Sequence, residues 1–262
     1  MEYLRQIAQR HLGSNSGIYR MAARLVDFLS ILKSEGFGTC RLLQRLTGSD
    51  REGNQVAVAL RRLSHPIVIR PATSDVPSVI NNCIREEYGQ FEETIAPKLI
   101  IDAGAYIGDT SAYFLSRFPG VKVIALEPNP ESFLQADLNL RPYGDRVTLV
   151  CAALWESIGV IDFGGEQTAA CVGGGGVEVR TVTIPALLSK FENAKIDILK
   201  MDIEGAELVV LRSAVGNWLN NVRLLLLETH GQNMEREVLP LVEREGFHCH
   251  RYRNVWYCYN IQ

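Results

Sequence analysis

The sequence predicts an α/β fold built around a parallel sheet, and three observations support this prediction. From residue 99 onward, short apolar runs alternate with segments of helical periodicity, the pattern of a parallel sheet covered by helices on both faces. The middle runs are almost entirely apolar, as strands covered on both faces must be. The run Leu99–Ile101 ends in Asp102 and is followed by a loop with Gly104 and Gly108. That order of strand, tight turn and helix start is typical of a nucleotide-binding βαβ unit.

The same periodicities place the individual elements of this sheet. We expect strands at residues 99–103, 122–127, 147–152, 196–202 and 224–228, and helices at about 109–118, 131–140, 206–214 and 233–245. Residues 247–253 and 255–260, separated by Asn254, predict a closing antiparallel pair. Residues 160–163 and 177–183 are β-rich and flank the four glycines 173–176, which predicts a β-hairpin insertion. Its tip is as consistent with a plain surface loop as with a substrate lid.

The N-terminal part of the chain has a different pattern. Apolar residues recur at helical spacing between Tyr19 and Lys33, and glycines divide the segment, so residues 1–63 are expected to form a helical extension or cap. Residues 65–71 predict a short edge strand because prolines lie near both ends. A turn and helix start at residues 74–77 should follow, with a helix over residues 79–88. The expected organisation is therefore an extension over 1–63 and a main domain over 64–262.

Bulk properties narrow the possible partners and location. The 262 residues carry a net charge of −3, which gives no basic surplus for nucleic-acid binding. No run of about 18 apolar residues occurs, so no membrane partner is expected. The start of the chain lacks a signal-peptide pattern, so a cytoplasmic location with reduced thiols is expected. The six cysteines form no C-x-x-C pair, so zinc is not expected, and Cys151 is interpreted as a small core residue. The sequence does not determine the oligomeric state.

The glycine loop and the two strand-end acids narrow the ligand class. The loop lacks the G-x-G-x-x-G pattern that cradles a pyrophosphate, and Asp102 brings a carboxylate towards the ligand. This favours a cationic ligand without phosphates, such as S-adenosylmethionine, with its ammonium and sulfonium groups. Glu127 ends the next strand at about the spacing of a ribose-binding acid, which NAD sites share. The alternatives are a turn or cap role for Asp102 and a solvated strand end for Glu127.

Four segments resemble a known family: Ile101–Thr110, Leu126–Pro128, Leu199–Glu207 and Leu227–His230. Together with the upstream segment from His65, they make residues 65–260 similar to the FkbM family of S-adenosylmethionine-dependent methyltransferases. The resemblance implies the class I methyltransferase fold, a Rossmann-like seven-stranded sheet whose last strand is antiparallel. It also implies methyl transfer, mostly to a hydroxyl oxygen of a sugar, polyketide or other secondary metabolite, with S-adenosylhomocysteine as the second product.

Ligands of open α/β sheets bind at the carboxyl ends of the strands, which selects the candidate cofactor residues. The glycine loop is expected at the methionine end of the cofactor and Glu127 at the ribose, and the resemblance places the adenine near residues 151–154. The candidate cofactor-binding residues are Asp102, Gly104, Ala105, Tyr106, Ile107, Gly108, Thr110, Glu127, Pro128, Asn129, Ala152, Ala153, Leu154 and Asp202.

Candidate catalytic residues follow the fourth and fifth strands of the sheet. Asp202 and Glu204, two apart, share a direction, and Glu228 and His230 repeat that spacing. His230 is the expected base because its ordinary pKa lies near neutral pH, with Asp202 second and Glu228 beside them. Glu204 and His230 are expected to bind substrate. The same four residues could instead hold Mg²⁺ or Mn²⁺, a reading not favoured here.

The sequence thus predicts an O-methyltransferase that uses S-adenosylmethionine and acts on a small molecule or carbohydrate. Two alternatives remain open at this stage. One is a nicotinamide-dependent oxidoreductase, against which the missing G-x-G-x-x-G argues. The other is a non-catalytic protein that binds S-adenosylmethionine and serves a partner.

Overall fold

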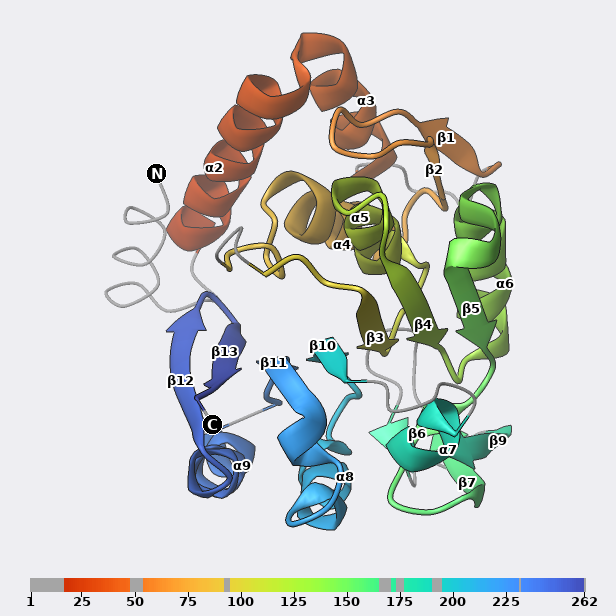
Figure 1. Ribbon diagram of the computed structural model, residues 1–262. Coiled ribbons are helices and arrows are strands. Elements are labelled where there is room, and N and C mark those ends of the chain that lie inside the picture. The colour runs from red at the N-terminus through yellow and green to blue at the C-terminus, as the bar shows by residue number, and fades with distance from the viewer. Residues whose placement is uncertain are drawn as a thin grey trace. The chain divides into compact units, whose positions relative to one another are not determined.

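The computed structural model describes residues 17–47, 54–91, 95–164, 171–172, 177–189, 195–230 and 232–261 (Figure 1). The chain divides into two compact units, Met1–Arg85 and Glu86–Gln262. The sequence predicted the boundary between residues 63 and 64, whereas the chain divides between residues 85 and 86. The difference arises because the edge strand and the helix after it belong to the first unit. No helix in the described ranges is long and apolar enough to span a bilayer.

The first unit combines helices with a small β-ribbon. Its elements are α2 (Gly17–Glu35), α3 (Phe37–Thr47), β1 (Val56–Val58), β2 (Ile67–Ile69), α4 (Asp75–Val79) and the π-helical turn η1 (Ile80–Ile84). The expected edge strand is confirmed as β2, which pairs antiparallel with β1. The expectation of helix throughout residues 1–63 is wrong at β1, and its first 16 residues lie outside the described part. Arg70 binds Asp75 through two hydrogen bonds of 2.8 and 2.9 Å, which fixes the start of α4.

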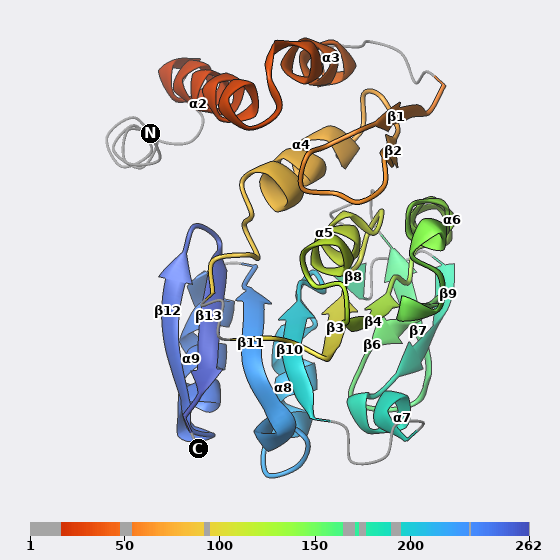
Figure 2. The same cartoon turned by 45° about the horizontal axis from the view of Figure 1, so that its top comes forward.

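The second unit is built on a seven-stranded sheet in the order β12-β13-β11-β10-β3-β4-β5 (Figure 2). The strands are β3 (Leu99–Ala103), β4 (Lys122–Leu126), β5 (Val147–Val150), β10 (Ile196–Met201), β11 (Val222–Glu228), β12 (Phe247–Tyr252) and β13 (Val255–Asn260). Only β13 runs antiparallel to its neighbours β11 and β12. The predicted class I methyltransferase topology, with an antiparallel last strand, is confirmed.

Four helices of this unit lie close to their expected positions: α5 (Asp109–Arg117), α6 (Pro130–Leu140), α8 (Glu207–Ala214) and α9 (Gln232–Arg244). The short helix α7 (Ile184–Leu188) and the 3₁₀ turns η2 (Arg141–Arg146) and η4 (Leu219–Asn221) were not predicted. Helix α6 begins where it does because Asn129 accepts hydrogen bonds from the amides of Glu131 and Ser132 at 2.9 and 3.1 Å. Pro130 at the first helical position adds a preset φ angle.

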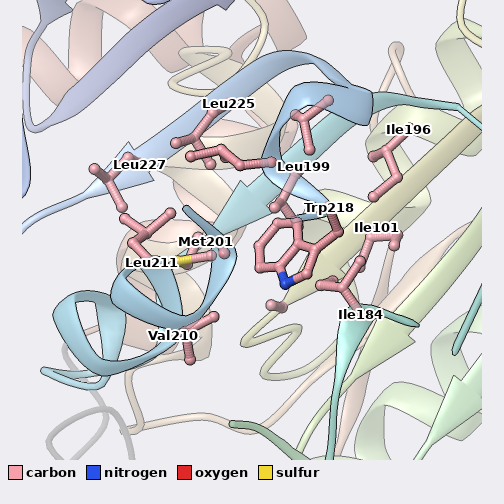
Figure 3. Packing of buried hydrophobic residues seen from close by; sticks show 14 of the residues in the cluster. Ile101, Ile184, Ile196, Leu199, Met201, Val210, Leu211, Trp218, Leu225 and Leu227 are labelled. Atoms are coloured by element: carbon pink, nitrogen blue, oxygen red, sulfur yellow. The ribbon is translucent and has the colours of Figure 1, made fainter. Parts of the chain in front are cut away.

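A continuous apolar core joins one face of the sheet to α8 and α9. Ile101, Leu199 and Leu225 come from three neighbouring strands and point to this face, where Trp218 packs with them (Figure 3). Side chains alternate between the faces of a strand, so the residues next to them, Asp102 and Lys200 among them, point to the opposite face. Asp102 and Lys200 therefore lie on the face opposite this core.

The β-rich insertion forms a second sheet. Strand β7 (Gly159–Gly164) pairs antiparallel with β9 (Val177–Val182), which confirms the predicted hairpin. Two further strands, β8 (Cys171–Val172) and β6 (Ala153–Leu154), extend it to the order β6-β9-β7-β8. The glycines 173–176 lie outside the described residues. The strand expected at 147–152 is wrong at its end, because the chain leaves the main sheet after Val150 and joins the second sheet at Ala153.

Two expectations about cysteines are also wrong. Cys151 is exposed rather than part of the core, since it lies where the chain passes from one sheet to the other. Cys249 and Cys258 form a disulfide instead of two reduced thiols. The register of β12 and β13 sets these two residues directly opposite each other, with Cα atoms 4.0 Å apart.

A buried ion pair links the two central strands of the sheet. Lys200 on β10 is the register partner of Asp102 on β3, and its Nζ lies 3.2 Å from Asp102 Oδ1. The same ammonium group donates to the carbonyl of Gly104 and lies 3.6 Å from Asp202 Oδ2. Burial by itself lowers the pKa of Lys200, but the two carboxylates outweigh it and hold that pKa above its usual range. Lys200 thus carries a charge that ties the strands and the glycine loop together.

We expect Gly104→Ala to lower the free energy of unfolding by about 3 kcal/mol. Gly104 has a φ angle of +82°, and a Cβ atom there would collide with the backbone carbonyl of Asp202. Gly120→Ala is the control, because a Cβ at Gly120 meets nothing within 4 Å and should change stability by about 0.5 kcal/mol at most. Urea denaturation of both variants is the measurement. Equal stabilities of the two variants would show that the close contact between Gly104 and the carbonyl of Asp202 is not required for stability.

We expect Lys200→Met to lower the free energy of unfolding by about 3–5 kcal/mol, since it leaves the charge of Asp102 buried without its partner. Adding Asp102→Asn to Lys200→Met should restore part of this loss, because both charges are then absent. Arg212→Met removes an exposed pair with Glu237 and should cost about 1 kcal/mol or less. Chemical denaturation measures all three. A loss in Lys200→Met no larger than in Arg212→Met contradicts the role given to Lys200.

Candidate functional site

The glycine loop that follows β3 is held against the end of β4. The amides of Gly104 and Ala105 both donate to the carbonyl of Leu126, at 3.0 and 2.9 Å. Gly104 and Gly108 have φ angles of +82° and +79°, in the left-handed region that glycine adopts without strain. Tyr106, between them, has a φ angle of +50°, which is uncommon for a residue with a side chain. The loop therefore has a defined shape set by backbone contacts to the next strand.

Glu127 follows β4 and closes this loop from the other side. Its Oε2 accepts from the amide of Tyr106 and its Oε1 from the amide of Asn129, both at 2.8 Å. Burial raises the pKa of Glu127 to about 7, against the effect of these two amides, which lower it. The carboxylate expected at a ribose is thus oriented by the glycine loop itself.

Asp102 is placed differently from the expectation. Its side chain is fully buried, with Oδ1 facing Lys200 and Oδ2 accepting from the hydroxyl of Ser111 at 2.6 Å. The prediction that this carboxylate faces a ligand is wrong for this structure, because both oxygens are engaged by the protein. The position of Asp102 just before the glycine loop indicated a role in ligand binding. Its ion pair with Lys200 could not be predicted from the sequence, because Lys200 lies 98 positions further along the chain.

The remaining candidate cofactor residues divide into two groups. Gly104, Tyr106, Pro128 and Asn129 are partly exposed, although the side chain of Asn129 is used as the cap of α6. The others are buried, so that little beyond their backbone could meet a ligand: Ala105, Ile107, Gly108, Thr110, Ala152, Ala153 and Leu154. The carbonyl of Ile107 is already bound by the side chain of Asn139 at 2.9 Å.

The residues predicted after the fourth and fifth strands do come together. His230 Nε2 lies 3.1 Å from Glu204 Oε2 and 3.6 Å from Asp202 Oδ1. One ligand atom from each of Asp202, Glu204 and His230 lies within 4.8 Å of the others. The turn that brings Glu204 into place has φ angles of +53° at Glu204 and +99° at Gly205. The expected meeting of Asp202, Glu204 and His230 is therefore confirmed. Glu228 is connected to them through the hydroxyl of Tyr88, which also contacts Asp202.

Tyr88 connects Glu228 to Asp202 and was not identified from the sequence. Its hydroxyl lies 2.8 Å from Glu228 Oε2 and 3.1 Å from Asp202 Oδ2. A phenol has one proton to donate, so Tyr88 serves one carboxylate at a time. Burial, together with these carboxylates, raises the pKa of Tyr88 well above its ordinary value. No local signal marks Tyr88, because it lies 114 positions before Asp202 in the chain.

The imidazole of His230 is more basic than expected, because carboxylates surround it. Its Nδ1 lies 3.2 Å from Oε1 of Glu207, the fully buried first residue of α8. This hydrogen bond, with the charges of Asp202 and Glu204, raises the pKa of His230 to about 9. The reasoning that its pKa matches neutral pH is therefore wrong for this structure. Glu207 also accepts from the amide of Ile203 at 3.1 Å, so it satisfies a backbone donor at the start of α8 as well.

The site is strongly acidic. Burial is the main cause that raises the pKa of Glu204 and of Glu228 to about 7, and the charge of Asp202 adds to it in both. The charged side chains that meet here include Asp102, Asp202, Glu204, Glu207, Glu228, Lys200 and His230, and Glu87 lies near enough to act on Glu228 and Tyr88. Such a site can accept protons, bind donors or hold a cation.

Comparison with known proteins gives a family match over the part of the chain that carries these residues. The sequence profile described as the Methyltransferase FkbM domain matches residues 102–249, more than half of the chain. The matched segment runs from the last part of β3 into β12 and includes the glycine loop, Glu127 and the acidic cluster.

Three similar proteins are named methyltransferases. The methyltransferase SdnD of Sordaria araneosa is 27% identical over 197 residues, which cover 60% of this chain and 76% of SdnD. The hexuronic acid methyltransferase AglP of Haloferax volcanii is 27% identical over 158 residues, 58% of this chain and 64% of AglP. The crystal structure of methyltransferase FkbM from Methylobacillus flagellatus superposes with a TM-score of 0.46 at 16% identity, over 85% of this chain and 59% of that one.

The profile match covers the sheet edge at which the glycine loop, Glu127 and the acidic cluster meet. On this match, the chain belongs to the FkbM family of methyltransferases.

Proposed function

We propose that this protein transfers a methyl group from S-adenosylmethionine to a hydroxyl oxygen of a small molecule or sugar. The observation that supports it best is the position of two polar centres at the carboxyl ends of four consecutive strands of the sheet, β4 and β3 for one centre and β10 and β11 for the other. One is Glu127 with the glycine loop, and the other is the cluster of Asp202, Glu228 and Tyr88. Lys200 links them, because it contacts both the loop carbonyl of Gly104 and Asp202.

The loop and Glu127 fit an adenosine-containing cofactor. Each oxygen of Glu127 accepts one backbone amide, and a carboxylate oxygen has a second lone pair with which to accept a ribose hydroxyl. Asp202 is partly exposed and offers a negative charge to the cationic methionine end. Asp102 contributes indirectly in this proposal, since it holds Lys200 and, through Lys200, the loop. S-adenosylmethionine supplies the methyl group, and the chain must bind it and manage the proton of the acceptor.

The proton released by the acceptor hydroxyl goes to a carboxylate in this proposal. Glu228 and Asp202 flank the hydroxyl of Tyr88, so a proton taken up by Glu228 passes to Asp202 when the phenol oxygen accepts it and the hydroxyl gives its own proton to Asp202. His230 and Glu204 then orient the acceptor. This revises the expectation of His230 as the base.

The acceptor class rests on the names of similar proteins. AglP is named for a hexuronic acid, and SdnD is named only as a methyltransferase. A carboxylate-rich site suits an acceptor with several hydroxyl donors, which describes a sugar or a polyhydroxylated small molecule. A hydroxylated acceptor panel that contains free and glycosidic hexuronic acids therefore tests the proposal, with methyl-labelled S-adenosylmethionine and product detection by mass. Binding of the cofactor without transfer to any acceptor would favour the non-catalytic alternative.

We expect Glu127→Gln to weaken binding of S-adenosylhomocysteine by about 10- to 100-fold, the value of hydrogen bonds to a charged group. Affinity of the unmodified protein should also rise from pH 6 to pH 8, because the pKa of Glu127 is about 7 and its ionised form is the better acceptor. Glu131→Gln, an exposed change at the start of α6, is the control. Isothermal calorimetry measures each affinity. An unchanged affinity in Glu127→Gln would remove Glu127 from the site.

We expect Glu228→Gln to lower the rate of methyl transfer by about 10²- to 10⁴-fold, because it removes a proton acceptor. The affinity for S-adenosylhomocysteine should stay within about threefold, since Glu228 meets Asp202 through the hydroxyl of Tyr88 and, among the described residues, has no hydrogen bond to the glycine loop. Glu243→Gln on α9 is the matched control for both measurements. A variant with a full rate of transfer would show that the proton leaves by another route.

A further inference from the structure

We infer that Asp202, Glu204 and His230 form a binding site for a divalent cation of the Mg²⁺ or Mn²⁺ type. The site belongs to the edge of the sheet to which methyl transfer is assigned, so the inference deepens the proposed function. Binding of the ion itself does not depend on that function. The sequence did not favour a cation site here. The structure favours one because ligand atoms of the three side chains lie within 4.8 Å of one another.

The three side chains have the spacing of ligands around one ion. Neighbouring ligands of an octahedral Mg²⁺ at about 2.1 Å are separated by about 3 Å. Nε2 of His230 lies 3.1 Å from Glu204 Oε2 and 3.6 Å from Asp202 Oδ1. Small side-chain rotations suffice to place an ion among them, since each of the three is partly exposed.

A second observation comes from Glu207, which lies behind His230. Glu207 is fully buried, and its Oε1 lies 3.2 Å from His230 Nδ1. Its Oε2 is buried and has no hydrogen-bond partner among the described residues. A carboxylate on Nδ1 is the usual partner of a metal-binding histidine, because it orients the ring and leaves Nε2 to face the ion. Glu207 therefore positions His230 so that Nε2 faces Glu204 and Asp202.

The balance of charge points the same way. The carboxylates of Asp202, Glu204, Glu207 and Glu228 gather around His230 and Tyr88, and Lys200 is already shared with Asp102. A divalent ion held by Asp202 and Glu204 supplies two positive charges next to these four carboxylates. Oxygen ligands with one imidazole, and no cysteine, suit Mg²⁺ or Mn²⁺ better than a thiolate-type metal.

The ion would give the site a second means of activating the acceptor. Three protein ligands leave coordination positions open, and a hydroxyl bound there becomes more acidic. Its proton then passes more easily to Glu228, which is not one of the three ligands. The inference thus assigns orientation of the acceptor to the cation and proton uptake to Glu228.

The test is a titration of the full chain with Mn²⁺ alone, without S-adenosylmethionine or acceptor, followed by electron paramagnetic resonance. We expect one bound Mn²⁺ per chain and a nitrogen hyperfine coupling in the pulsed spectrum. His230→Gln should abolish that coupling, and Glu204→Gln should weaken the affinity by at least about tenfold. Glu207→Gln, which removes the negative charge on Nδ1 of His230, should weaken it by about 10- to 100-fold.

Glu243→Gln is the matched control, since it makes the same chemical change on an exposed residue of α9. Circular dichroism melts of all variants separate loss of the ion from loss of the fold. The inference is overturned if the unmodified protein binds no Mn²⁺ at millimolar concentration, or binds it as well in Glu204→Gln as in Glu243→Gln. A bound ion without nitrogen coupling also overturns it, because His230 would then not be a ligand.

The outcome for the ion is separable from that for methyl transfer. Full methyl transfer in the presence of EDTA, combined with no Mn²⁺ binding, contradicts the cation site and leaves the proposed function in place. One Mn²⁺ held by the three residues in a protein that methylates no acceptor supports the cation site and contradicts the proposed function.

Discussion

The ammonium group of Lys200 is the contact on which the rest of the site depends. It is buried between β3 and β10, and it meets Asp102, Asp202 and the carbonyl of Gly104. Each of these belongs to a different part of the site: the end of a strand, the acidic turn and the glycine loop. A buried charge is stable only when it is paired, so the position of Lys200 constrains all three at once. Its apolar neighbours on β10 point to the other face, where α8 and α9 cover them.

The acidic cluster is assembled at one edge of the sheet by parallel neighbours and an adjoining segment. Asp202 and Glu204 follow β10, Glu228 ends β11, and Tyr88 arrives from the segment before β3. Burial disfavours their charged forms, and repulsion between close carboxylates adds to it, so the pKa values of Glu204 and Glu228 rise. The chain tolerates this because the strands and α8 are fixed by the apolar core on the opposite face. The carboxylates at the ends of β10 and β11 are therefore suited to taking up a proton from a bound acceptor or to binding a cation.

Much of the fold and part of the site could be predicted from the sequence. The run from Leu99 to Asp102 and the glycines after it gave the first strand and loop, because period and turn chemistry are local properties. The meeting of Asp202, Glu204 and His230 followed from the rule that parallel strands end at a common edge. The exposure of Cys151 could not be foreseen, since it depends on where the chain passes to a second sheet. The disulfide of Cys249 depends in the same way on the register of β12 and β13.

The sequence by itself determined the order of strands and helices, the glycine loop and the residues at the strand ends. Only the tertiary structure decided what each charged group meets. Asp102 faces Lys200 rather than a ligand, Tyr88 lies between two carboxylates, and Glu207 holds His230. The physical reason is that these partners are brought together by strand register and by packing between distant segments. A carboxylate has the same local sequence signal whether it meets solvent, a ligand or a buried lysine, and its chemistry differs in each case.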